Sequence, residues 1–174
     1  YDCLLFSEQL ESLGKWYRQL TAESVGKEFN KFGGKINNGI TPCISIGSND
    51  MHSMFQLYIG GPRDKMLHIV SIRKTKPINL PSYKEYEELV KNIQGKQLGR
   101  IMNDIVNSVR ISFKEKEIPF TETIIDNNNE FSIGEFLMLK QIEIILLAYL
   151  FNVNPFDQPN VEIYKENVKR LLKR

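Results

Sequence analysis

The segment from Lys65 to Ile72 constrains the fold of this chain more than any other. Five of its eight residues are apolar: Met66, Leu67, Ile69, Val70 and Ile72. A short, dense apolar run is typical of a strand that is covered on both faces, as in parallel sheets. Residues 2–6, 42–46 and 120–125 are three more predicted strands, and helices are predicted between them. This alternation predicts an α/β fold, with a mostly parallel sheet flanked by helices.

Cap and turn residues place the other elements. We expect a helix that Ser7 caps and that ends near Phe29, because apolar residues recur there at helical spacing. Glycine and asparagine pairs predict a loop from Phe32 to Gly39. The further predicted helices are a short one over His52–Ile59 capped by Asn49 or Asp50, a long region from Ser82 to Phe113, an apolar helix capped by Ser132, and a terminal helix with Pro159 in its first turn.

Composition indicates one ordinary globular domain, spanning residues 1–174. The chain has 23 basic and 21 acidic residues and a net charge of +2, which disfavours a nucleic-acid partner. The most apolar stretch, Phe136–Val153, contains Lys140, Gln141 and Glu143. It therefore indicates a core helix and no membrane partner. Since the first residue is Tyr1, we expect the chain to be part of a longer polypeptide.

The two cysteines, Cys3 and Cys43, form no disulfide framework in a chain of 174 residues. We expect them to be reduced and buried, in a cytoplasmic protein. Two histidines and two cysteines at unrelated spacings predict no metal site, and no cofactor is predicted.

Three groups of polar residues could carry chemistry. Gln19 and Glu23 are four residues apart and share one helix face, so Glu23 is a candidate general base, although solvated surface pairs have the same spacing. His52, in the first turn of its expected helix, would be a neutral acid/base group or a structural histidine. We interpret His68, inside a strand, as structural. Gln158 and Lys165 are seven residues apart, and one helical face carrying both would suit a polyhydroxylated anionic ligand.

These groups lie in three blocks, Trp16–Lys27 (WYRQLTAESVGK), Gly47–Lys65 (GSNDMHSMFQLYIGGPRDK) and Asn154–Lys165 (NPFDQPNVEIYK). Taken in this order, the blocks resemble the signatures of the C-terminal sugar-isomerase (SIS) domain of the glucose-6-phosphate isomerase family. The resemblance extends from Phe6 to Lys173. It implies a three-layer SIS-type fold and a cofactor-free isomerase of glycolysis and gluconeogenesis, which interconverts glucose 6-phosphate and fructose 6-phosphate through a cis-enediol.

The resemblance also implies residue roles. Glu23 is the base that moves a proton between C2 and C1, with Gln19 in the substrate site. Gln158 contacts the substrate and Lys165 shares in ring opening. His52 assists ring opening in the site of the neighbouring subunit, which implies a homodimer. Glu11 begins a second Glu-Ser-x-Gly-Lys run, but the spacing to His52 favours Glu23.

The sequence differs from the family pattern at two positions, and one part of the family's active site is not in it. Asn160 and Tyr164 stand where the family pattern commonly has glycine. The phosphate-binding loop and the arginine that stabilises the enediolate belong to an N-terminal SIS domain that these residues do not include. Losing such electrostatic stabilisation costs about 10²–10³ in rate, so we expect the isolated chain to be inactive. The alternative interpretation is a non-catalytic SIS module that binds sugar phosphates and regulates a partner.

Overall fold

The computed structural model describes residues 1–173, which form two compact units. The first unit contains residues 1–14 and 43–134, and the second contains residues 15–42 and the described residues from 135 onward. Two helices, α1 (Glu11–Val25) and α4 (Glu130–Leu150), begin in the first unit and end in the second.

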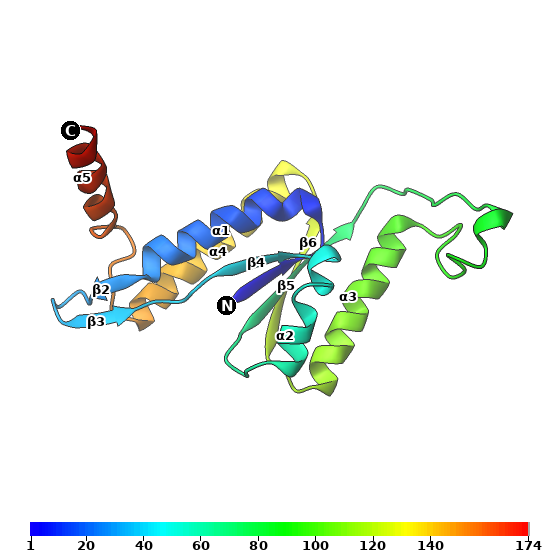
Figure 1. Ribbon diagram of the computed structural model, residues 1–174, viewed down its shortest axis with the longest axis horizontal. Helices are drawn as coiled ribbons and strands as arrows, with labels where there is room; N and C mark the ends of the chain where they lie inside the picture. Colours follow the sequence, from blue (N-terminus) through cyan, green and yellow to red (C-terminus); the bar gives the residue numbers. More distant parts are fainter. Residues whose placement is uncertain (174) are drawn as a thin grey trace. The chain divides into compact units, whose positions relative to one another are not determined.

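A four-stranded parallel sheet forms the centre of the first unit (Figure 1). Its strands lie in the order β4 (Cys43–Ile46), β1 (Asp2–Leu5), β5 (Leu67–Lys74) and β6 (Phe120–Asn127). The register is regular, with Leu4 opposite both Ser45 and Ile69. The predicted α/β class and the four predicted strands are confirmed, because each strand of this sheet overlaps one of the predicted strand segments.

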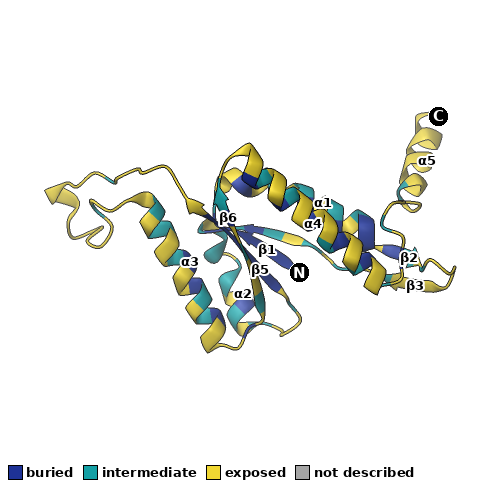
Figure 2. Ribbon diagram, turned by 180° about the vertical axis from the view of Figure 1, so that it is seen from behind, coloured by how far each residue is buried: buried dark blue, intermediate teal, exposed yellow. Residues whose placement is uncertain are grey.

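The two central strands are buried along their shared length, as Figure 2 shows for β1 and β5. Alternate residues of a strand point to opposite faces of the sheet. Leu4 and Ile69 therefore share one face, where they join a core with Tyr58 of α2 (Phe55–Gly60) and Phe113 of α3 (Leu98–Glu115). Burial on both faces explains why the segment around Ile69 has no polar alternation.

One connection of the first unit differs from prediction. The expected helix from Ser82 to Phe113 is wrong in its first half, where only the short 3-10 helix η3 (Lys84–Tyr86) and turns occur before α3. Residues 82–97 are almost entirely exposed, so no packing stabilises a helix there. Two more 3-10 helices are η1 (Glu8–Leu10) and η2 (Asn49–Met51).

The second unit pairs α1 with α4, which lie side by side in Figures 1 and 2. Helix α1 ends at Val25, not near Phe29, and the chain turns into an antiparallel hairpin of β2 (Lys27–Phe29) and β3 (Lys35–Asn38). The loop predicted over residues 32–39 is therefore partly strand. Gly26 makes the tight exit possible, since a Cβ there would lie 2.6 Å from the carbonyl oxygen of Ala22. The last helix, α5 (Val161–Leu172), is exposed from its second residue onward.

The two cysteines have different environments. Cys3 is buried in β1 as expected, whereas Cys43 is exposed and the expectation of burial is wrong for it. Cys43 opens β4, which is an edge strand with a neighbour on one side only. Neither thiol forms a disulfide within residues 1–173.

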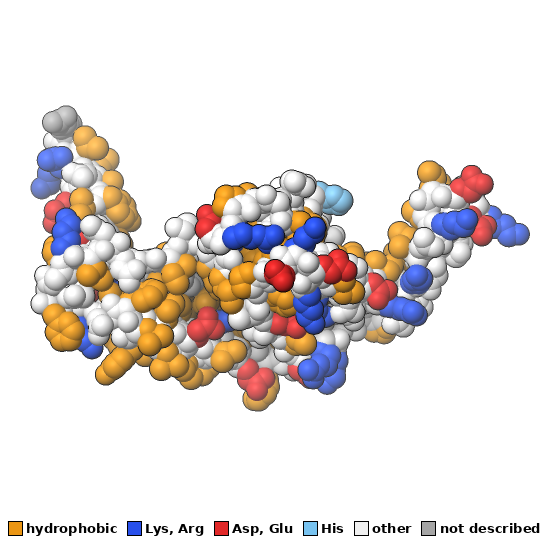
Figure 3. All heavy atoms as spheres, turned by 90° about the horizontal axis from the view of Figure 1, so that it is seen from below, with side chains coloured by type: hydrophobic (Ala, Val, Ile, Leu, Met, Phe, Trp, Pro, Cys, Tyr) orange, Lys and Arg blue, Asp and Glu red, His pale blue; other side chains and the backbone are white. Residues whose placement is uncertain are grey.

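The structure also shows how charged and apolar side chains are distributed. On the face drawn in Figure 3, acidic and basic side chains are interspersed and form no field of one sign. Within residues 1–173, no helix is both long and apolar enough to cross a membrane.

Candidate active site

The carboxylate of Glu23 accepts hydrogen bonds from two side-chain amides. Gln19 Nε2 donates to Oε1 over 3.1 Å, from one turn earlier on α1. Gln158 Nε2 donates to Oε2 over 2.8 Å, from the loop before α5. The structure therefore brings together three of the predicted site residues, two of them 135 positions apart. A carboxylate held at both oxygens has a defined orientation, as a general base requires.

The loop that carries Gln158 is fixed by polar contacts. Asn154 Oδ1 accepts the backbone N–H of Phe156 over 3.1 Å, and Asn154 Nδ2 donates to Asp157 Oδ2 over 2.9 Å. Lys27 Nζ donates to the backbone oxygen of Asp157 and lies 3.1 Å from Asp157 Oδ1. Sequence reasoning assigned Lys27 no role, although it ends the first of the three blocks.

Gln158 lies before the terminal helix, so it does not share a helix face with Lys165. Helix α5 begins at Val161, with Asn160 at its N-cap position and Pro159 before it, so the predicted start of this helix is one turn too early. Asn160 has φ −74°, an ordinary right-handed value. Replacing glycine there causes no backbone strain.

Lys165 lies in the first half of α5, where its ammonium donates to Glu162 Oε1 over 2.7 Å. This hydrogen bond and the charge of Glu162 raise the pKa of Lys165 above its ordinary value, and Glu23 adds a weaker attraction. The ammonium therefore stays protonated near the Glu23 carboxylate. Tyr164 is 60% exposed.

His52 lies in the other unit, and its local structure differs from prediction. It is the exposed C-cap residue of η2, and its backbone N–H donates back to Asn49 and Asp50. Helix α2 begins only at Phe55. His52 therefore does not lie in the first turn of a helix, and the prediction that placed it there is wrong.

The two remaining candidates have the predicted placements. His68 is buried in β5, with Nδ1 2.6 Å from the hydroxyl of Thr121 and Nε2 3.1 Å from that of Thr123. Glu11 is the exposed first residue of α1.

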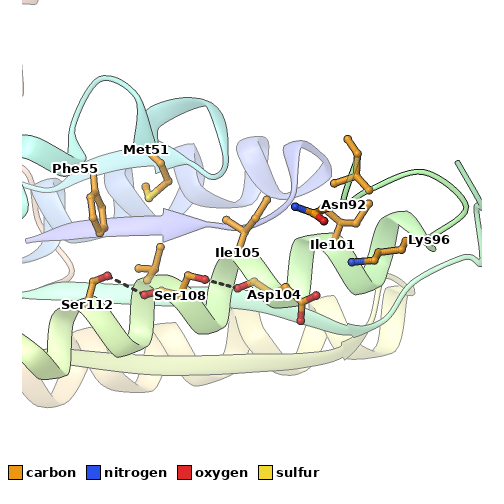
Figure 4. A pocket seen from close by; sticks show the side chains of 11 residues that line it. Met51, Phe55, Asn92, Lys96, Ile101, Asp104, Ile105, Ser108 and Ser112 are labelled. Atoms are coloured by element: carbon orange, nitrogen blue, oxygen red, sulfur yellow. Dashed lines mark hydrogen bonds between the residues drawn. The ribbon is translucent and has the colours of Figure 1, made fainter. Parts of the chain in front are cut away.

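Each unit also has a hollow on its surface. The hollow of the first unit, of about 400 Å³, lies between η2, α2 and α3. Met51 and Phe55 line one side and Ile105 the other, while Ser108 and Ser112 bond to backbone oxygens of α3 (Figure 4). The hollow of the second unit, of about 580 Å³, has Lys27 and Asp157 in its wall. Among residues 1–173, no three His, Cys, Asp or Glu side chains are grouped so as to hold a metal ion.

Comparison with known proteins identifies the family. The phosphoglucose isomerase family model matches residues 2–174. The chain belongs to the phosphoglucose isomerase family. Two similar members are the glucose-6-phosphate isomerases of Methanocaldococcus jannaschii, 32% identical over 173 residues, and Carboxydothermus hydrogenoformans, 30% identical over 171 residues. The match covers 97% of this chain in both cases, but only 39% and 37% of the two relatives.

Two solved structures support the fold of this phosphoglucose isomerase family member. A hypothetical protein from Thermus thermophilus matches with a TM-score of 0.90 and 26% identity, covering 98% of this chain and 40% of that protein. A glucose-6-phosphate isomerase from Chlamydia trachomatis matches with a TM-score of 0.81 and 16% identity, covering 99% of this chain and 34% of that protein.

Proposed function

We propose that residues 1–174 are the C-terminal SIS-type domain of a glucose-6-phosphate isomerase. The domain would interconvert glucose 6-phosphate and fructose 6-phosphate, together with the part of the enzyme that this chain does not include. Membership of the phosphoglucose isomerase family supports the reaction class. The observation that carries the proposal is the pair of amides that orients the carboxylate of Glu23.

In the proposed reaction, Glu23 takes the proton from C2 of open-chain glucose 6-phosphate. The electron pair of that C–H bond becomes part of a cis-enediolate over C1 and C2. The proton of the hydroxyl on C2 passes to the oxygen on C1, and Glu23 returns its own proton to C1, which gives fructose 6-phosphate. The proton and the electron pair both stay between enzyme and substrate, so the step needs no external oxidant or reductant.

The other residues would prepare and position the substrate. Lys165, as a stable ammonium on α5, would stabilise the ring oxygen or carbonyl oxygen during ring opening. Gln158 would contact the sugar beside Glu23, since its amide reaches that carboxylate from a neighbouring loop. His52 would assist ring opening in the neighbouring subunit of a homodimer. Contacts to the phosphate and to the enediolate charge would come from the N-terminal SIS domain.

The decisive experiment uses an active enzyme that contains this chain. Glu23→Gln should lower kcat by about 10²–10⁴ with little change in KM, because an amide keeps the shape of the carboxylate but takes no proton. Glu11→Gln is the matched control and should change kcat less than about twofold. The measurement is a coupled assay of fructose 6-phosphate isomerisation.

Two outcomes would contradict the proposal. If the Glu11→Gln variant is inactive and the Glu23→Gln variant is active, the base is Glu11 and our assignment of Glu23 is wrong. Wild-type protein that binds fructose 6-phosphate in calorimetry, yet does not isomerise it with its whole length present, would favour the regulatory module.

A further inference from the structure

We propose that Lys27 is a positioning residue, which holds the loop of residues 154–160 so that Gln158 reaches Glu23. This inference rests on the proposed function for its catalytic consequence. Its structural part concerns only Lys27 and the loop. A positioning residue acts through another side chain and does not touch the substrate.

The first argument is the burial of a charge. The Lys27 side chain is only 5% exposed, whereas the side chain of its partner Asp157 is 52% exposed. A buried ammonium needs acceptors, because bulk water does not reach it. Both acceptors of Lys27 described here, the backbone oxygen and Oδ1 of Asp157, belong to the loop. Moving the loop away would leave the charge without them, so the loop is held firmly.

The second argument is the rigidity of the segment that carries Lys27. Lys27 follows Gly26 directly at the end of α1 and pairs with Asn38 in the β2–β3 hairpin. The backbones of Gly26 and Gly39 are so close that a Cβ on Gly39 would lie 3.1 Å from Gly26 Cα. Lys27 is thus fixed both to the helix that carries Glu23 and to the hairpin.

The third argument is sequence adjacency. Asp157, which Lys27 holds, is the residue before Gln158, and Glu23 is one turn before Lys27 along the chain. A second contact, from Asn160 Nδ2 to Glu28 Oε2 over 3.2 Å, joins the same two segments a little further along each. Gln158 therefore lies between two anchored positions, and its 2.8 Å bond to Glu23 follows from that geometry.

The test combines a structural and a kinetic measurement on an active enzyme that contains this chain. Lys27→Met keeps most of the side-chain volume and removes the charge. Amides of residues 154–160 should then exchange hydrogen faster in mass spectrometry, and kcat/KM should fall about 10- to 100-fold, since small misplacements of site groups cost this much. Lys74→Met, which removes an exposed lysine paired with Asp126 in the other unit, is the control and should change neither quantity.

A double-mutant cycle separates positioning from a merely structural role. If Lys27 acts through Gln158, the double variant Lys27→Met/Gln158→Ala should be no more than about threefold worse than the poorer single variant. Losses that multiply would overturn the inference, and so would an unchanged exchange rate in the loop. If Lys27→Met does not fold, Asp157→Ala removes the carboxylate acceptor from the exposed side and leaves the backbone acceptor in place, so the same two changes should appear in smaller measure. A wild-type enzyme without isomerase activity would refute the proposed function, while loop exchange would still decide the structural part.

Discussion

At the scale of single residues, Lys140 is the most unusual side chain of the second unit. It lies on the apolar helix α4 and is 1% exposed. Its ammonium donates to Glu143 Oε2 over 2.7 Å and lies 5.0 Å from the ring centre of Tyr17. The Tyr17 hydroxyl donates to the other oxygen of Glu143 over 2.5 Å. Carboxylate and aromatic ring together compensate the buried charge and join α4 to the helix of the proposed base.

We expect the two partners of this ion pair to differ in their effect on stability. Glu143→Leu should lower the free energy of unfolding by about 3 kcal/mol, because it leaves a buried ammonium without its carboxylate. Lys140→Met should cost about 1 kcal/mol or less, since Glu143 is 42% exposed and can turn to water. Urea unfolding of the two variants measures the difference. If both variants lose the same free energy of unfolding, Glu143 does not stabilise the protein by compensating the charge of Lys140.

At the scale of the elements, the start of α4 shows how sequence reasoning can miss by one turn. Ser132 was the predicted cap, yet Asn129 has both properties of one. Its side-chain oxygen accepts the N–H of Ser132 over 2.9 Å, and its backbone oxygen accepts the N–H of Ile133 over 3.0 Å. Ser132 is itself buried inside the first turn. Asparagine and serine are equally good caps, so residue type alone did not distinguish them.

The cap predicts a difference between two substitutions. Asn129→Ala should lower the free energy of unfolding by about 1 kcal/mol, because it leaves a helix N–H without its acceptor. Asn129→Asp should retain most of the stability. Ser132→Ala should cost less than half as much as Asn129→Ala, in the same urea titration. A larger loss of unfolding free energy for Ser132→Ala than for Asn129→Ala would show that Ser132 is the cap, as the sequence indicated.

What the sequence could predict depended on the range of the interactions. The four strands of the sheet were predictable because each segment is rich in apolar or β-branched residues and is bounded by turn residues. The Gln19–Glu23 pair was predictable because helical spacing is local. The β2–β3 hairpin was missed because its strands are short, and β3 is mostly exposed. The contact between Gln158 and Glu23 spans 135 positions, so no local pattern contains it. Family resemblance placed both residues in one site, and the structure added their bond.

At the scale of the whole molecule, we propose that the site extends over more than this chain. The chain spans 39% and 37% of the two isomerase relatives described above. Helix α4 exposes large apolar side chains, including Met138, Leu146 and Tyr149, and exposed apolar surface is typical of interaction sites. Glu23, Gln158 and Lys165 belong to one unit and His52 to the other. These features agree with our proposal that a working site needs further polypeptide.

The proposed dimer makes the arrangement of the site testable. If His52 acts in the neighbouring subunit while Glu23 acts in its own, a closed two-fold dimer places each pair reciprocally. In an active enzyme that contains this chain, Glu23→Gln and His52→Ala homodimers should each lose nearly all activity. Equal amounts refolded together form heterodimers about half of the time, and each heterodimer has one site with both wild-type groups. About a quarter of wild-type activity should therefore return under such isologous pairing, measured by the coupled assay. If native mass spectrometry detects heterodimers and activity stays at the level of the separate variants, His52 does not act across the interface.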